Sequence, residues 1–234
     1  MSNHPHVKLL QTYTSYEQKT KEWFEERKKY ITASNFATVL GMNKYKTPEK
    51  YFFELFGFDP FKGNSCTAHG ETYEDEAIRI YEHCTGRKVY RFGCIPYNFL
   101  HPNDTEKSFL AGSVDGIAVL TDENGCEYDP IIIEVKCPEM RRIKYGECPE
   151  VYYPQIQCNS AICELEWTDF IEYVPVGIQG NDELQFHITR IQRNKEWFDL
   201  QCEVAQRFVE SINHYRTIGI ENHPRFLKYK NKNK

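Results

Sequence analysis

Two apolar stretches of this sequence, residues 109–120 and 131–137, indicate neighbouring β-strands. The second begins with three isoleucines, and a run of β-branched residues is typical of a short buried strand. The first is mainly apolar and is interrupted by two glycines. Turn-forming residues 121–125, Thr-Asp-Glu-Asn-Gly, connect the two. We therefore predict that these strands pair in an antiparallel arrangement.

Hydrophobic periodicity and capping residues indicate the remaining elements. Helices are predicted over residues 16–29, 35–40, 48–56, 68–84, 151–163 and 194–215, and further strands over residues 88–97, 168–174 and 184–191. Residues 1–15 are predicted to be a loose lead-in, and residues 228–234 a disordered basic tail. This order predicts an α/β fold with a central mixed sheet flanked by helices, in a single domain over residues 1–234.

Composition limits where a nucleic acid could bind. The 234 residues carry a formal net charge of −5, so any contact with DNA must come from a local basic patch. The chain has 9 cysteines without a C-x-x-C pair, and its N-terminus lacks the apolar segment of a signal peptide. We expect reduced thiols and an intracellular location. A membrane-spanning segment is not expected either, because no apolar run is long enough.

Charged residues at the end of the second strand are candidates for chemistry. Glu134 and Lys136 are two residues apart, so they share one face of the strand. Burying two charged side chains is costly. They therefore either pair with each other, lie at a strand tip that emerges into water, or bind a metal. Antiparallel pairing would bring Asp115 of the first stretch beside Glu134. Two carboxylates and a lysine at the end of a sheet are suited to a divalent cation with an electrophilic helper.

Two further groups have alternative interpretations. Glu74 shares a helical face with Ala77 and Ile78, so it is either a hydrogen-bonded buried acid or a carboxylate near the metal. Residues 140–146 form a basic loop after Lys136, and this loop is either solvated or in contact with DNA. Its basic residues are Arg141, Arg142 and Lys144.

Asp115…Glu134-Val135-Lys136 resembles the core motif of the PD-(D/E)XK nucleases. Four more blocks resemble, in the same order, the YqaJ-like viral recombinase family, which includes phage lambda exonuclease. They are Arg27…Ile31-Thr32-Ala33-Ser34, His69-Gly70…Glu74…Ala77, Gly112-Ser113-Val114-Asp115-Gly116 and Tyr152…Gln155-Ile156-Gln157. The resemblance implies the restriction-endonuclease-like α/β fold of these nucleases.

The resemblance also implies a set of metal-binding and catalytic residues. Mg²⁺, with Mn²⁺ as a substitute, would be bound as one or two ions by Glu74, Asp115, Glu134 and the carbonyl of Val135. The catalytic residues would be Asp115, Glu134, Lys136, Gln155 and Gln157, with Tyr152 as a further DNA contact. On a helix, Gln155 shares a face with Asn159, whereas Gln157 lies elsewhere unless the helix begins late.

Three polar residues, Arg27, Ser34 and Ser113, match positions that bind a DNA 5′ phosphate in the phage relative. An arginine fork and serine hydroxyls suit a phosphate, although Ser34 could instead cap a helix and Arg27 could form a surface ion pair. The implied activity is 5′→3′ digestion of double-stranded DNA from its ends, which leaves 3′ single strands for recombination and repair.

The resemblance implies partners as well. They would be duplex DNA ends, a single-strand annealing protein and, as in the phage relative, other copies of the chain in a trimeric ring. For a viral protein the location would be the host cytoplasm, the host nucleus or the virion. Two alternatives remain: an endonuclease on the same core, and a DNA-binding module with a decayed site. The complete set of Glu74, Asp115, Glu134 and Lys136 argues against decay.

Overall fold

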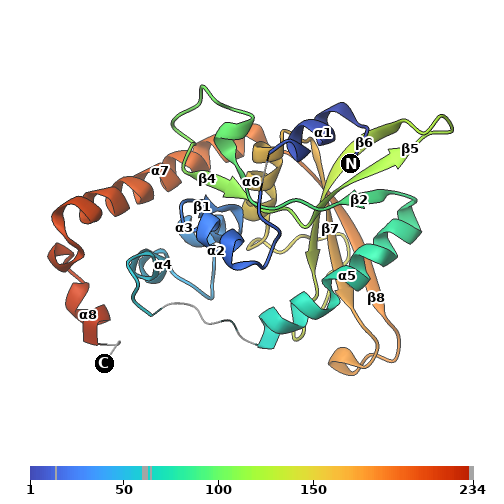
Figure 1. Ribbon diagram of the computed structural model, residues 1–234. Coiled ribbons are helices and arrows are strands. Elements are labelled where there is room, and N and C mark those ends of the chain that lie inside the picture. Colours follow the sequence, from blue (N-terminus) through green and yellow to red (C-terminus); the bar gives the residue numbers. More distant parts are fainter. Residues whose placement is uncertain (14, 60–62, 64, 232–234) are drawn as a thin grey trace.

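Figure 1 shows the computed structural model of the chain, which describes residues 1–13, 15–59, 63 and 65–231. Its strands are β1 (Ile31–Thr32), β2 (Lys88–Tyr90), β3 (Ile95–Pro96), β4 (Leu110–Gly112), β5 (Gly116–Thr121), β6 (Glu127–Lys136), β7 (Trp167–Val174) and β8 (Gln185–Gln192). Its α-helices are α1 (Pro5–Gln11), α2 (Lys21–Arg27), α3 (Ala33–Val39), α4 (Pro48–Leu55), α5 (Ser65–Thr85), α6 (Tyr153–Cys163), α7 (Lys195–Ile218) and α8 (Phe226–Lys230). Short 3₁₀ helices are η1 (Tyr97–Phe99), η2 (Ile178–Gly180) and η3 (Ile220–Asn222).

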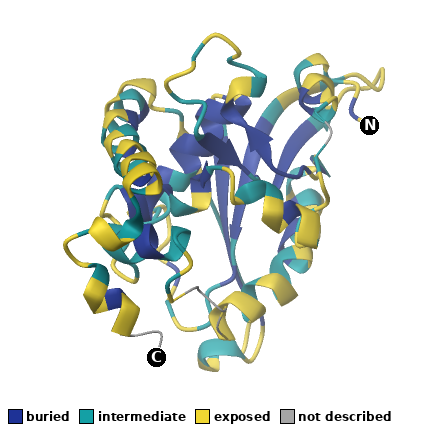
Figure 2. Cartoon of the chain, turned by 60° about the vertical axis from the view of Figure 1, so that its left-hand side comes forward, coloured by how far each residue is buried: buried dark blue, intermediate teal, exposed yellow. Residues whose placement is uncertain are grey.

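The strands form two sheets between layers of helices. The larger sheet has the order β2-β5-β6-β7-β8, and the smaller has the order β1-β4-β3. The pairs β6–β7 and β1–β4 are parallel, and the others are antiparallel. Figure 2 shows the buried strands inside a shell of helices whose outer faces are exposed. The prediction of an α/β fold with a central mixed sheet is therefore confirmed.

Pairing of β5 with β6 is antiparallel, as the sequence predicts, and its register sets the site. Gly116 pairs with Ile133, so Asp115 and Glu134 lie next along the two strands. Successive side chains of β6 point to opposite faces. Ile133 and Val135 pack in the core beside α5, which leaves Glu134 on the other face, toward α6.

The apolar stretch 109–120 is two strands, where the sequence predicts one. It divides into β4 and β5, which belong to different sheets, and residues 113–115 cross between them. Residues 88–97 likewise divide into β2 and β3. In the smaller sheet Ile31 pairs with Leu110 and Thr32 with Ala111, so the chain that follows α2 lies beside β4. The crossing therefore runs from the last residue of β4, Gly112, to the first residue of β5, Gly116.

Helix α6 is buried on nearly all sides, so its polar side chains need partners inside the protein. Gln157 donates to the carbonyl of Gln192 (2.9 Å) and accepts from the backbone N–H of Asn194 (2.6 Å). Ser160 bonds to the hydroxyl of Thr168 (3.1 Å). These bonds attach α6 to β7, β8 and the start of α7.

Both ends of the chain contain more structure than expected. The lead-in contains α1, because Val7 and Leu10, three residues apart, are both buried on one helical face. The expected disordered tail begins within α8, where the ring of Tyr229 stacks on Phe53 at 3.9 Å. Lys228 also pairs with a glutamate of α4 at 2.8 Å. Residues 14 and 232–234 lie outside the described part of the chain, as do residues 60–62 and 64 of the loop expected before α5.

Candidate active site

A cavity of about 840 Å³ brings together most of the residues proposed from the sequence. Its walls come from α2, the start of α3, α5, the crossing between β4 and β5, the end of β6 and the residues around the start of α6. The cavity is lined by Arg27, Ser34, Glu74, Ser113, Asp115, Glu134, Val135, Lys136, Arg141, Tyr152 and Gln155.

Glu134, which is buried, and Asp115, which is partly exposed, form a carboxylate pair at the ends of β6 and β5. Oδ2 of Asp115 accepts a hydrogen bond from the backbone N–H of Val135 at 2.7 Å. Oε1 of Glu134 accepts from Nζ of Lys136 and from Nε2 of Gln155, both at 2.5 Å. Burial and the neighbouring Glu134 raise the pKa of Asp115 to about 8, against the opposing effect of Lys136.

The Lys136 side chain remains charged in this environment. Burial lowers its pKa, but Glu134 and Asp115 raise it further, so the net shift is upward. Its ammonium lies 5.2 Å from the centre of the Tyr152 ring. The ion pair expected as one alternative is thus present, and it lies within the cavity rather than on a solvated strand tip.

The donor set fits a hard divalent cation. Across residues 1–13, 15–59, 63 and 65–231, no three His, Cys, Asp or Glu side chains are grouped to hold a metal. Asp115 and Glu134, however, offer two carboxylates to one lysine, and burial together with the charge of Glu134 raises the pKa of Asp115. Mg²⁺ is typically bound by one or two carboxylates and keeps several waters, so it requires no third protein acid.

Glu74 lines the cavity but does not join this carboxylate pair. Its oxygens pair with Lys19 at 3.2 Å and with Arg91 at 2.7 Å. Arg91 also donates to the backbone carbonyl of Asp115 at 2.9 Å. Glu74 therefore contacts the site through Arg91, which the sequence did not indicate.

Arg27 lies between the hydroxyls of Ser34 and Ser113. Its Nη1 donates to Ser113 and its Nη2 to Ser34, each at 2.9 Å. The guanidinium lies 4.2 Å from the centre of the Trp23 ring. Burial lowers the pKa of Arg27, although a guanidinium stays charged. The three predicted phosphate-binding residues thus meet, and Ser34 is not a helix cap, because Thr32 holds that position.

The two glutamines of α6 have different environments. Gln155 donates to Glu134, so the structure places it at the carboxylate pair. Gln157 is fully buried and does not line the cavity, because both ends of its amide bond to β8 and the start of α7. The structure therefore does not bring Gln157 to the site. It adds Asn159 instead, whose Nδ2 lies 3.3 Å from Oε2 of Glu134. The sequence signal for the contact of Asn159 with Glu134 is that Asn159 shares a helical face with Gln155.

The loop of residues 140–146 contributes Met140 and one of its basic residues, Arg141, to the cavity. Nη2 of Arg141 lies 2.5 Å from the buried carboxylate of Glu172 on β7, and the guanidinium lies 5.7 Å from the Tyr152 ring centre. Burial raises the pKa of Glu172, and Arg141 opposes that shift. Arg142 and Lys144 are exposed and do not line the cavity.

Removing Arg141 should destabilise the fold, because Glu172 would then be buried without its cation. Breaking a buried ion pair typically costs about 3–5 kcal/mol, and the partial exposure of Arg141 reduces the loss expected for Arg141→Ala to about 2–3 kcal/mol. The measurement is the free energy of unfolding in urea. The matched control is Arg142→Ala, which removes an exposed charge from the same loop and should change it by less than about 0.5 kcal/mol. Equal losses in both variants would contradict a stabilising role for the pair.

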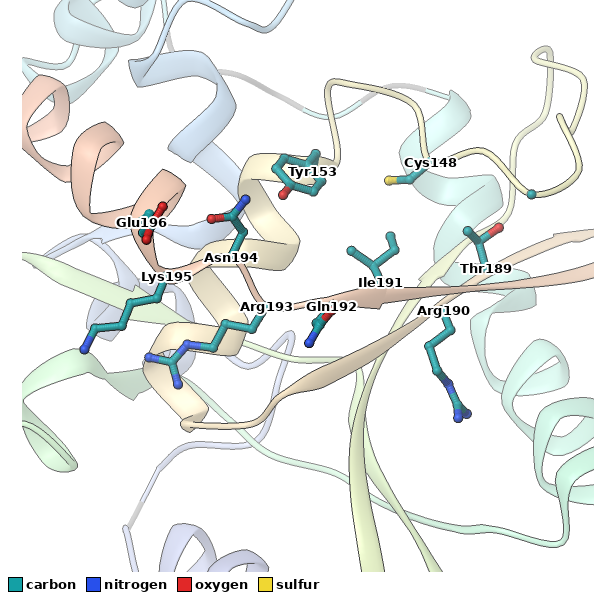
Figure 3. Close-up of a pocket in the computed structure, with 11 residues that line it drawn as sticks. Cys148, Tyr153, Thr189, Arg190, Ile191, Gln192, Arg193, Asn194, Lys195 and Glu196 are labelled. Atoms are coloured by element: carbon teal, nitrogen blue, oxygen red, sulfur yellow. The ribbon is translucent and has the colours of Figure 1, made fainter.

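A second groove, of about 760 Å³, lies along the end of β8 and the start of α7. In Figure 3, Thr189 and Ile191 lie on the same side of β8 as Cys148 and Tyr153, whereas Arg190 points the other way. Arg190 pairs there with the buried Asp169 at 2.9 Å. None of the candidate site residues is among the described residues that line this groove.

The mixed sheet flanked by helices, with Asp115 and Glu134-Val135-Lys136 at the ends of adjacent strands, has the PD-(D/E)XK nuclease fold. The chain belongs to the YqaJ-like viral recombinase domain family, whose model matches residues 22–166.

Among solved structures, the chain is similar to an alkaline exonuclease from Laribacter hongkongensis. The TM-score is 0.64 at 26% identity, over 83% of this chain and 93% of that one. The same exonuclease in complex with dAMP gives a TM-score of 0.63 at 27% identity, over the same shares of the two chains.

Two curated relatives are longer proteins. An uncharacterised protein of Acanthamoeba polyphaga mimivirus is 25% identical over 70% of this chain and 30% of its own length. The uncharacterised protein YqaJ of Bacillus subtilis is 29% identical over 76% of this chain and 52% of its own length. The chain thus spans about half or less of each of these relatives. Among the described residues, no helix has the length and apolar character needed to cross a membrane.

Proposed function

We propose that this protein is a Mg²⁺-dependent exonuclease that digests duplex DNA from 5′ ends and leaves 3′ single strands. The observation that carries the proposal is one cavity lined by two chemically different groups of residues. Arg27 and the two serines offer donors for a phosphate, and Asp115 and Glu134 offer oxygens for a cation. Residues 113–115 connect the two groups directly. Family membership and the similarity to an alkaline exonuclease support the same activity.

Asp115 and Glu134, with the carbonyl of Val135, would hold the cation. We assign Glu74 to the surrounding charge network, because Lys19 and Arg91 already engage its carboxylate. When bound, Mg²⁺, or Mn²⁺ in its place, lowers the pKa of a water molecule and stabilises charge on a scissile phosphate.

The other residues orient the carboxylates or compensate negative charge. Lys136 brings a fixed positive charge beside the carboxylate pair, where it can stabilise the additional negative charge of a phosphate transition state. Gln155 holds Oε1 of Glu134 in the orientation that faces the cavity. Tyr152 packs against both Lys136 and Arg141, so its role is to support these two cations.

Arg27 would bind the terminal phosphate in the same cavity. Its guanidinium contacts hydroxyls, and it forms no ion pair with a described carboxylate, so its charge is available to an anion. Ser34 and Ser113 add neutral donors. A seated 5′ end would then direct the next phosphodiester toward Asp115 and Glu134. The substrates are duplex DNA ends, and we propose a single-strand annealing protein and further copies of this chain as partners.

A 5′ phosphate should accelerate digestion by wild-type protein by about 10- to 100-fold over a 5′ hydroxyl. A hydrogen bond between charged groups contributes about 1.5–3 kcal/mol, and each 1.4 kcal/mol corresponds to a factor of about ten. Arg27→Ala should reduce that preference to less than about threefold. The measurement is the initial rate on linear duplexes that differ only in the 5′ group.

Lys28→Ala is the matched control, because Lys28 is the next residue, is exposed and pairs with Glu25. This variant should retain the full preference for a 5′ phosphate. Equal wild-type rates on both duplexes, or digestion that begins at 3′ ends, would contradict the proposed phosphate site. Cleavage of covalently closed circular duplex would then favour the alternative of an endonuclease on the same core.

A further inference from the structure

Asn159 differs from the other polar residues buried in α6. Gln157 and Ser160 bond to neighbouring strands and the start of α7, whereas Asn159 extends toward the carboxylate of Glu134. It is 1% exposed, and its Oδ1 has no hydrogen-bond partner among the described residues. Native proteins rarely bury an unpaired carbonyl oxygen without a compensating role.

The orientation of the Asn159 amide follows from the chemistry of its neighbour. An ionised carboxylate only accepts hydrogen bonds, so Nδ2 must face Glu134 and Oδ1 must face away. On that side lies Gly112, the last residue of β4. A Cβ added at Gly112 would lie 2.5 Å from Oδ1 of Asn159, so this position accepts the amide because it has no side chain.

The two oxygens of Glu134 consequently have different surroundings. Oε1 bonds to Lys136 and Gln155, which line the cavity, whereas Oε2 bonds to Asn159, which does not. The terminal torsion of a glutamate is otherwise broad, so a donor on the inner oxygen restricts its rotation. That contact keeps Oε1 directed at the cavity.

We propose that Asn159 is a positioning residue that orients the carboxylate of Glu134 for metal binding. Through its contact with Gly112, which directly precedes Ser113, it also links that carboxylate to the proposed phosphate site. The inference rests on the proposed function, because it assumes that Glu134 is a metal ligand. Residues that orient metal ligands typically change metal affinity by 10- to 100-fold when they are replaced.

The test is calorimetric titration of Ca²⁺ and Mn²⁺ into the full chain without DNA. Asn159→Ala removes the donor, and Asn159→Leu removes it while keeping a similar shape. Both should weaken the affinity for metal by 10- to 100-fold. Ser160→Ala removes a buried hydrogen bond from the same helix and should leave that affinity within twofold of wild type, whatever its effect on the melting temperature.

Gly112→Ala perturbs the same contact from the side of β4. The added methyl group displaces the Asn159 amide, and the metal affinity should fall as it does in Asn159→Ala. If the variants do not fold, the side-chain amide resonance of Asn159 in wild-type protein decides the question. It should shift on addition of Ca²⁺, and a constant resonance would overturn the proposal.

The outcomes separate this inference from the proposed function. Wild-type protein that binds neither cation contradicts the metal site itself, and the role of Asn159 fails with it. Wild-type protein that binds metal, with folded Asn159 variants of unchanged affinity, overturns the positioning role alone. In that case Asn159 would serve the packing of α6, and only the melting temperature would change.

Discussion

Replacing Asp115 with asparagine should reduce the cleavage of duplex DNA by about 10³-fold or more while leaving the protein at least as stable. The side chain keeps its size, and its carbonyl oxygen can still accept the hydrogen bond from Val135. What is lost is the charge that would bind the cation, and metal assistance contributes several kcal/mol, at a factor of ten for each 1.4 kcal/mol. Stability should not fall, because burial and the charge of Glu134 disfavour ionised Asp115, whose pKa is raised to about 8.

The measurements are single-turnover cleavage with saturating Mg²⁺ and the free energy of unfolding without metal. Glu71→Gln is the control, because Glu71 lines the same cavity and, among the described residues, no hydrogen bond joins it to Asp115 or Glu134, so this variant should keep near-normal activity. Asp115→Asn that cleaves DNA at a near-normal rate would remove Asp115 from the metal site. A large loss of stability in this variant would instead identify Asp115 as a structural residue.

The carboxylate pair was predictable because its determinants are local in sequence. The β-branched run that becomes β6 marks a buried strand, and the short connector makes antiparallel pairing with β5 the simplest arrangement. Alternation then places Glu134 and Lys136 on one face. The boundaries of β4 and β5 were not predictable, because an unbroken apolar run does not reveal a change of sheet.

The proposed phosphate-binding group depends on pairing between distant segments. Arg27 and Ser34 reach Ser113 because β1 pairs with β4, and Ile31 lies opposite Leu110. Composition and periodicity do not encode such a pairing, and the family resemblance alone pointed to it. The same limit applies to Glu74, whose partner Arg91 follows β2.

Gln157 and Asn159 illustrate how burial decides the role of a polar residue. Both are amides on α6, and the family motif favoured Gln157. On a helix that is buried all round, however, every polar group must find a hydrogen-bond partner. The direction in which each side chain points from the helix determines that partner. Gln157 faces β8 and the start of α7, so it serves structure, while Asn159 faces Glu134.

Lys136→Ala should lower the turnover number by about 10²- to 10³-fold while changing the affinity for DNA much less. One preorganised electrostatic donor contributes about 2.7–4 kcal/mol to a transition state, and Lys136 lies beside the carboxylates where negative charge would develop. An interaction made mainly in the transition state lowers kcat and kcat/KM together. Single-turnover rates and DNA dissociation constants, measured separately with Ca²⁺ in place of Mg²⁺ for binding, distinguish the two effects.

Lys50→Ala is the matched control for Lys136, because Lys50 lines the same cavity but forms its ion pair with Asp59, at 3.7 Å, and not with Asp115 or Glu134. This variant should keep a turnover number within a few-fold of wild type. If Lys136→Ala instead weakens DNA binding and turns over bound DNA at the normal rate, Lys136 is an anchor for a phosphate in the ground state. The transition-state charge would then have to be stabilised by the metal and by Arg141, the other cation that packs on Tyr152.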